Sequence, residues 1–365
     1  MSHNMIIAVG GCGTNIIKAA AKSNLLDDVT MYAIDSVTSS IDIQMVNRVN
    51  VIPIISDEKS GSGRNRERGR AMFEYHDQNG KFEKMYEDAV KAKTPVIVIT
   101  SAAGGTGSGS VVPLCEKLLA KGVEQVIPII VCPNMQDPDA YHLNTNDCLI
   151  ELGEVGIKTY SIFRNTRGDA DYAPVNNEVV NLIEIIFGKR YDKSDADPIT
   201  RDTIDDSDLD MILETPGRFI AVSAQANDVD TLQKEVTRKV LSGFQMGWTA
   251  EDAENSTLVT AIALTSMFAS KDYPDVFAEV GARIKHSIDQ YKHIVDSDNG
   301  GICTASMIVA GLPRPEVKQV SGEFRESAGL AAGLKRSERP SFMTRKKASV
   351  SKPSDNGTLG QFNWK

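Results

Sequence analysis

The sequence lacks the features that direct a chain into or across a membrane. It has no run of about 18 apolar residues, the length that a membrane-spanning helix needs. The first apolar segment, Met5 to Val9, is too short for a secretory signal, and no Lys or Arg precedes it. We therefore expect a soluble, cytoplasmic protein with no membrane partner.

Cysteine is also scarce. The five cysteines are an odd number, and none is spaced as C-x-x-C, so the sequence predicts neither a disulfide framework nor a zinc site. We expect reduced thiols, several of them in the core. A formal net charge of −9 also argues against a general nucleic-acid binder.

The 365 residues, 41% of them hydrophobic, are enough for one large or two ordinary domains. Strand-like, turn-like and helix-like segments alternate along the first half of the chain. This order predicts an α/β fold with a doubly wound parallel sheet and a ligand at the carboxyl ends of its strands.

A glycine-rich stretch, Ser101 to Ser110, follows the apolar run Val96 to Ile99 and precedes a helix-like segment. Four glycines between Gly104 and Gly109 let the backbone approach a ligand, and the helix start offers unpaired amides to a phosphate. Ser110 and Val111 stand where a P-loop has Lys and Ser or Thr, so this is not a Walker A loop. A flexible turn without a ligand is the alternative.

A second turn of this kind, Gly10 to Asn15, follows the predicted strand Met5 to Val9. Gly11-x-Gly13 begins like a dinucleotide fingerprint, but Ile16 replaces the third glycine. No His or Tyr proton donor is evident near the sheet edge either. A nucleotide-dependent oxidoreductase with a Rossmann-like domain is therefore an alternative that these residues disfavour.

Two motifs carry a family resemblance. Gly-Gly-Thr-Gly-Ser-Gly at Gly104 to Gly109 resembles the signature loop of the tubulin/FtsZ superfamily, whose members bind GTP and polymerise. The pattern G-x-G-x-N-x-E-x-G-R at Gly61 to Arg70 is similar to the third loop of FtsZ, which senses the terminal phosphate. The likeness covers roughly residues 5 to 312. It implies a GTPase domain with a mostly parallel sheet, a long central helix and a smaller second α+β domain.

The resemblance implies a site for GTP or GDP with Mg²⁺, in which the protein supplies no metal ligand. Asn15, Asn165 and Asn177 would contact the purine, and Tyr172 would stack on it. Asp35 suits a ribose or a metal-bound water, or equally a helix cap. The full set is Gly10, Gly11, Cys12, Gly13, Asn15, Asp35, Gly61, Gly63, Asn65, Ala103, Gly104, Gly105, Thr106, Gly107, Ser108, Asn165, Tyr172 and Asn177.

The segment Thr203 to Asp210 resembles the catalytic loop of FtsZ, in which two aspartates match Asp205 and Asp208. The Asn that precedes them in the family is Thr203 here, so Asp206 and Asp210 are possible substitutes. The resemblance implies that these aspartates enter the nucleotide site of a neighbouring copy. Stacking of this kind builds a head-to-tail filament and activates hydrolysis of GTP.

The segment Lys335 to Lys365 differs from the rest, with eight Lys and Arg against Glu338 and Asp355. We expect it to be disordered when free, as a solvated terminus or as an arm that binds DNA or an acidic protein surface. A basic arm is similar to that of the TubZ branch, which segregates plasmid or phage DNA through the DNA-bound adaptor TubR. A relative that acts in cell division or phage positioning is the alternative.

The predicted domains are a nucleotide-binding domain (1–172), a central helix with connector (173–202), an α+β domain (203–314), a C-terminal helix (315–334) and the basic tail (335–365). Within them we expect a helix over Val276 to Ile294 and a polar connector over Lys189 to Asp202. Val123 to Val131 is a further predicted apolar strand, in which Pro128 is unusual for a central position. The fifth loop, Cys132 to Asp139, lacks the family's Phe-x-Phe-Glu-Gly pattern and predicts no ribose ligand.

Overall fold

The computed structural model describes residues 3–37, 47–55, 61–93, 95–165, 171–188, 199–202, 204, 206–246, 259–267, 273–282, 287–296 and 302–313. Contacts divide the chain into Met1–Arg325, which holds all of these residues, and Glu326–Lys365. The predicted C-terminal helix and basic tail lie outside the described residues. The domain boundaries drawn from the sequence stay predictions.

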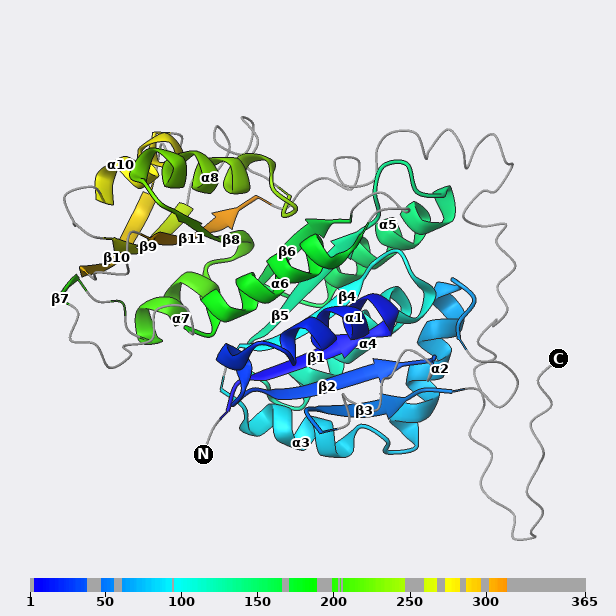
Figure 1. Ribbon diagram of the computed structural model, residues 1–365. Coiled ribbons are helices and arrows are strands. Elements are labelled where there is room, and N and C mark those ends of the chain that lie inside the picture. Colours follow the sequence, from blue (N-terminus) through cyan, green and yellow to red (C-terminus); the bar gives the residue numbers. More distant parts are fainter. Residues whose placement is uncertain are drawn as a thin grey trace, which may run out of the picture. The chain divides into compact units, whose positions relative to one another are not determined.

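The described strands form one hydrogen-bonded sheet in the order β3-β2-β1-β4-β5-β6-β8-β11-β9-β10-β7 (Figure 1). Their bounds are β1 (Met5–Val9), β2 (Thr30–Asp35), β3 (Val49–Pro53), β4 (Val96–Ser101), β5 (Val126–Cys132), β6 (Thr159–Arg164), β7 (Ile199–Asp202), β8 (Gly217–Ala226), β9 (Val259–Met267), β10 (Ser287–Asp296) and β11 (Cys303–Leu312).

The helices of the described residues fill the connections between these strands. Their bounds are α1 (Gly10–Ala20), the 3-10 helix η1 (Asn24–Leu26), α2 (Arg66–Gln78), α3 (Glu83–Lys91), α4 (Gly105–Ala120), α5 (Asp139–Glu154), α6 (Ala173–Ile186), α7 (Asp206–Glu214), α8 (Val229–Ser242) and α10 (Tyr273–Gly281).

The six neighbouring strands β3, β2, β1, β4, β5 and β6 are all parallel. This confirms the predicted doubly wound sheet. β1 pairs with β2 on one side and with β4 on the other, so the chain order reverses between β1 and β4. In sheets of this kind a ligand binds at such a switch point, outside the carboxyl ends of the strands. The glycine-rich turns after β1 and β4 lie side by side there.

Alternation along the strands separates two cores. On β1, Ile6 and Ala8 belong to one buried cluster, whereas Met5, Ile7 and Val9 belong to the other. Helices α1, α6 and α7 supply the first cluster, and α2, α3, α4 and α5 supply the second. The parallel sheet is therefore covered on both faces, as its continuous apolar strands require.

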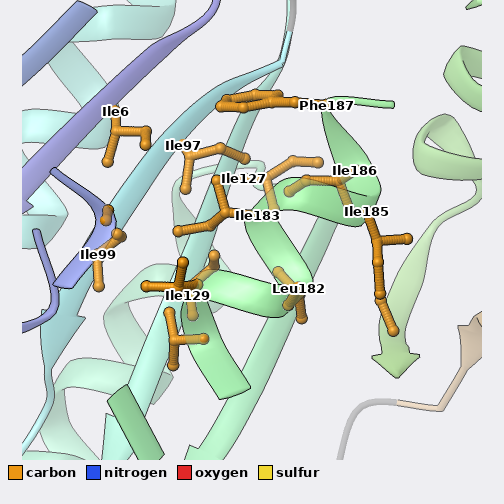
Figure 2. Packing of buried hydrophobic residues seen from close by; sticks show 14 of the residues in the cluster. Ile6, Ile97, Ile99, Ile127, Ile129, Leu182, Ile183, Ile185, Ile186 and Phe187 are labelled. Carbon is orange, nitrogen blue, oxygen red and sulfur yellow. The ribbon is translucent and has the colours of Figure 1, made fainter. Parts of the chain in front are cut away.

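Helix α6 is the main cover of the first face. Figure 2 shows isoleucines of β1, β4 and β5 against the last turns of this helix, where Leu182, Ile183 and Ile185 are fully buried. This packing fixes α6 from the edge where the ligand is expected, at Ala173, to the opposite edge at Ile186. It matches the long central helix predicted from the sequence.

The second half of the chain extends the same sheet. β6 joins β8 through a short parallel ladder, Thr159 with Gly217 and Tyr160 with Arg218. β8, β11 and β9 are antiparallel neighbours, and α8 and α10 cover a separate apolar cluster on β8 and β11. This arrangement is the predicted second α+β region.

One expectation about an element was wrong. The helix expected over Val276 to Ile294 ends at Gly281, and Ser287–Asp296 is strand β10 because it pairs with β9 and β7. The connector before α7 ends in the short strand β7. Pro128 lies in a central strand, where it is tolerated because the ladder from β5 to β6 begins only at Ile129.

Candidate functional site

The two glycine turns after β1 and β4 contact each other. α1 begins at Gly10 itself, so the turn expected over Gly10 to Asn15 is already helical. A Cβ on Gly10 would lie 2.9 Å from the amide nitrogen of Gly107, and one on Gly107 would lie 2.4 Å from Thr100 Oγ1. Only glycine allows this approach. A Cβ on Gly104, in contrast, meets nothing within 4 Å.

The starts of α1 and α4 are open to an anion. Val9 and Gly104 are their N-cap residues, and neither helix has a side-chain capping hydrogen bond. The first amides of both helices therefore lack an intrahelical acceptor, and both helix dipoles present their positive ends. Two such ends at one switch point form a lysine-free nest that suits phosphate groups.

A chain of buried hydroxyls joins three loops beside this nest. Ser36, after β2, lies 2.6 Å from Thr106 through the hydroxyl oxygens, and the Thr106 hydroxyl donates to Ser62 at 3.0 Å. All three side chains are buried. The sequence predicted Thr106 but missed Ser36 and Ser62, because nothing local to either residue indicates that its loop reaches α4.

Asp35 ends β2 and is almost fully buried. One carboxylate oxygen accepts the amides of Ser36 and Val37 at 2.7 and 3.3 Å, and the other accepts the Thr14 hydroxyl at 3.3 Å. These contacts hold the turn after β2 against α1. The Asp35 carboxylate therefore accepts the amides of its own turn, and its two predicted roles, as a cap of the next helix or as a contact of the nucleotide, stay predictions.

The third loop, Gly61 to Asn65, has an unusual backbone. Gly61, Gly63 and also Arg64 have positive φ values of 80, 62 and 64°. Asn65 then caps α2, because its side chain accepts the Arg68 amide at 2.8 Å. The loop packs directly on the start of α4, where a Cβ on Gly105 would lie 2.7 Å from the backbone nitrogen and oxygen of Asn65.

Ion pairs behind the third loop tie α2 to α5. Arg66 donates to both carboxylate oxygens of Glu151 at 2.7 and 2.8 Å, and Arg70 adds a third contact at 2.8 Å. Burial disfavours the charged forms, but the arginines outweigh it and lower the pKa of Glu151. Nearer the nest, burial raises the pKa of the Cys12 thiol to about 12, so at pH 7 this group adds no negative charge.

The residues predicted to contact the purine lie at the same edge. Asn15 on α1 and Asn177 on α6 are exposed, and each lies about one turn inside its helix. Asn165 directly follows β6 and is half-buried, with its amide donating to Cys132 at 2.8 Å. Tyr172 is the N-cap residue of α6 and is 40% exposed. Their roles toward a base stay predictions.

The fifth loop forms a compact turn of its own. Asn134 accepts the amide of Gln136 through its side chain, and its own amide donates to the Asp137 carboxylate at 2.8 Å. The Asn134 side chain also donates to the carbonyl of Asn165 at 3.4 Å, which links this loop to the end of β6. Its side-chain oxygens are thus engaged within the loop, and we assign no ribose ligand here.

Asp208 lies at the other edge of the sheet. Its helix, α7, ends beside the amino ends of β5 and β6, where Gln125 donates to the carbonyl of Leu213 at 2.7 Å and Thr159 to that of Thr215 at 3.2 Å. α6 has 14 residues, so the two edges are about 20 Å apart. Asp208, half-buried, cannot reach the nest of its own chain. Asp205 lies outside the described residues.

Comparison with known proteins gives the fold. No protein-family model and no curated protein matches the sequence. CetZ2 from Haloferax volcanii, a GTPγS-bound protofilament, matches with a TM-score of 0.71 and 16% identity, over 91% of this chain and 100% of that one. TubZ from Bacillus thuringiensis serovar israelensis, a GTPγS-form protofilament, matches at 0.66 with 18% identity over 90% and 94%. An FtsZ dimer from M. jannaschii matches at 0.61 with 14% identity over 85% and 88%.

The chain has the tubulin/FtsZ fold. This result confirms the fold that the resemblance of the glycine motifs implies. Within the tubulin/FtsZ fold, the nest and the third loop occupy one edge of the sheet and α7 the opposite edge. Identities of 14 to 18% carry the fold alone, so the roles of the individual site residues stay predictions.

Two features are absent from the part of the chain that the structure describes. None of its helices combines the length and the apolar character needed to cross a membrane. No group of three or more His, Cys, Asp or Glu side chains in the same residues is placed to hold a metal ion.

Proposed function

We propose that this chain binds GTP or GDP at the nest between α1 and α4, and that it hydrolyses GTP when a second copy completes the site. The observation that carries this proposal is the separation of two partial sites. An open phosphate nest lies at one edge of the sheet, and the aspartate-bearing helix α7 lies about 20 Å away at the other. Neither is complete within one chain.

The chemistry of the nest supports a nucleoside triphosphate. Backbone amides of α1 and α4 bind phosphate oxygens without a lysine, and Ser62, which accepts the Thr106 proton, adds its own hydroxyl donor at the third loop. Asn15, Asn165 and Asn177 offer amide groups, which both donate and accept and so suit the guanine edge. The solved CetZ2 and TubZ relatives contain GTPγS, which supports the same ligand class.

Mg²⁺ fits this site without a protein cage. The ion usually keeps several waters and is held largely by the phosphates of its nucleotide, where it supplies charge neutralisation. The hydroxyls of Thr106 and Ser62 lie at the start of α4 and would offer oxygen atoms to the waters of such an ion.

Assembly follows from the positions of the two partial sites. Asp208 of one copy, with Asp205, would lie against the nest of the next and orient the attacking water, which is all that phosphoryl transfer asks of such a group. This contact uses two different surfaces of the chain, so it does not close and produces a filament. CetZ2 and TubZ were solved as protofilaments, which supports self-association of this kind.

A role in segregating plasmid or phage DNA is the finer proposal. It rests on the charge of Lys335 to Lys365, eight Lys and Arg against two acidic residues. Such an arm suits a DNA-bound adaptor, whose phosphates or acidic side chains it would neutralise. A relative in cell division or phage positioning would share the GTPase chemistry and use a different cargo.

The test is GTP hydrolysis per molecule as a function of protein concentration, with light scattering recorded in parallel. Hydrolysis completed by a second copy rises steeply above a threshold concentration and coincides with scattering. Asp208→Ala keeps GTP binding but loses turnover by at least about 100-fold and leaves persistent filaments. A rate per molecule that is indifferent to dilution, or equal loss of binding in Asp208→Ala, would contradict the shared site.

A further inference from the structure

Asn144 on α5 bridges two loops of the nucleotide edge. Its side-chain nitrogen donates to the carbonyl oxygen of Arg64 in the third loop and to that of Ala103, the residue before the N-cap of α4, both at 3.0 Å. A primary amide has two hydrogens. Both are therefore used, one on each loop, and neither loop carbonyl can move away without losing its bond.

The Arg64 carbonyl is held where the backbone is unusual. Arg64 is the one non-glycine residue with a positive φ, 64°, among the described residues. For a residue with a Cβ this conformation is unfavourable and needs support from its surroundings. Asn144 supplies that support from outside the loop, because its hydrogen bond fixes the direction of the carbonyl group of Arg64 itself.

The side chain of Arg64 is held from the same helix face. Its guanidinium lies over the ring of Tyr141, 4.9 Å from the centroid, and Tyr141 precedes Asn144 by three positions. α5 is itself anchored on α2 through the contacts of Glu151 with Arg66 and Arg70. The third loop is thus contacted by a helix that is itself fixed to α2, the helix that directly follows this loop.

We propose that Asn144 is a positioning residue that sets the third loop against the start of α4 and so determines how strongly the site prefers a nucleotide with a terminal phosphate. The third loop and the nest converge at Gly105, and the hydroxyls of Thr106 and Ser62 meet there. A loop held at this point can contact the outermost phosphate, whereas a released loop leaves only the nest. This inference rests on the proposed function.

Asn144→Asp is the decisive variant. The carboxylate has almost the same shape but only accepts hydrogen bonds, so it faces two carbonyl oxygens with no proton to donate. Asn144→Ala removes the bonds without this repulsion. We expect kcat/KM for GTP to fall about 30-fold in Asn144→Asp and less in Asn144→Ala, and the ratio of GTP affinity to GDP affinity to fall about tenfold, while GDP affinity changes less than threefold.

The matched control is Asn79→Asp. Asn79 also donates from its side chain to a carbonyl, that of Tyr75 at 2.7 Å, but it is exposed at the far end of α2. The Asn79→Asp variant removes the same kind of hydrogen bond and adds the same negative charge, but far from the nest. The ratio of GTP affinity to GDP affinity should therefore not change. Equal ratios in Asn144→Asp, Asn79→Asp and the unaltered chain would overturn the inference.

Amide hydrogen exchange makes the result independent of hydrolysis. In the nucleotide-free protein, Asn144→Asp should speed exchange of the amides from Ser62 to Asn65, with no change in the strands of the sheet. If the unaltered chain bound no GTP, the proposed function would fail, yet the exchange would still test the positioning role. Unchanged exchange in this loop would contradict that role whatever the nucleotide data show.

Discussion

Two glycines of the nest, Gly107 and Gly104, differ in the space that surrounds them. Gly107 touches β4 and β1, since an added Cβ would lie 2.4 Å from Thr100 Oγ1 on β4 and 3.2 Å from the carbonyl oxygen of Val9 on β1. Gly104 faces open space, with φ −77° and no atom within 4 Å of an added Cβ. The first position is required by packing, whereas the second keeps room where a phosphate would approach.

Replacing each glycine by alanine should therefore give opposite outcomes. Gly107→Ala forces backbone atoms apart and should lower the free energy of unfolding by about 2 kcal/mol or more. Gly104→Ala should leave stability unchanged within about 0.5 kcal/mol, because its conformation suits alanine, yet weaken GTP binding about tenfold or more. Urea denaturation and nucleotide titration of both variants provide the measurements. Normal GTP binding in a stable Gly104→Ala protein would show that the phosphate does not approach that side.

The sequence predicted these glycines because a phosphate nest is encoded by adjacent residues. Asn144 could not be predicted in the same way, since its partners Arg64 and Ala103 belong to loops that meet only in the folded chain. Ser62 lies inside a recognised motif, but at a position that the motif leaves open. Its link to Thr106 depends on how α2 packs against α4.

Among the elements, the pair α2 and α5 supports the site from behind. Arg66 and Glu151 have side chains only 10% and 28% exposed, and their contact is bidentate, so it is worth more than a surface ion pair. The arginines lower the pKa of Glu151 below its ordinary value of 4.5, although burial alone would raise it. The folded state therefore stabilises the ionised carboxylate.

Glu151→Gln should lower the free energy of unfolding by about 1 to 2 kcal/mol at pH 7. The contribution of Glu151 is complete above its ordinary pKa of 4.5 and is lost as the pH falls through the lowered value, so the difference from the unaltered chain should shrink below about pH 4.5. Urea denaturation between about pH 3 and 8 measures it. Glu154→Gln, exposed on the same helix, is the control and should show no such difference. A difference that stays constant with pH would argue against a charge effect.

Element types could be predicted where a strand is apolar throughout and a glycine turn follows, as for β1 and β4. The sequence of Ser287–Asp296 predicts a helix instead, because Ile288, Tyr291 and Ile294 are spaced by three. The segment is a strand since β9 and β7 offer it backbone partners on both sides. The strand that contains Pro128 could be predicted but its central position could not, because the tolerance of a proline depends on where the neighbouring ladder begins.

At the scale of the whole molecule, the nest and the α7 aspartate lie at opposite edges of one sheet. α6 spans the distance between them and is buried along its last turns against β1, β4 and β5 (Figure 2). A rigid helix of this kind keeps a fixed geometry between the nest of one copy and the α7 aspartate that would enter the next. The fold could be predicted from local motifs, but this separation required the structure, because sequence alone does not place α7 at an edge.

The basic segment Lys335 to Lys365 is the expected contact for a charged partner. Its eight Lys and Arg give it a charge opposite to that of the rest of the chain, so an electrostatic partner should bind there without involving the GTPase site. Deleting the segment should leave the threshold concentration and rate of GTP hydrolysis within about twofold and reduce binding to a DNA-bound partition adaptor by at least about 100-fold. Changing the eight Lys and Arg to Gln keeps the length and should have the same effect.

Binding of the adaptor to the unaltered chain should weaken steeply as salt is raised, by nearly one power of the salt concentration for each phosphate neutralised. Adaptor binding that survives the deletion, or that does not depend on salt, would assign the contact to the folded part of the chain instead.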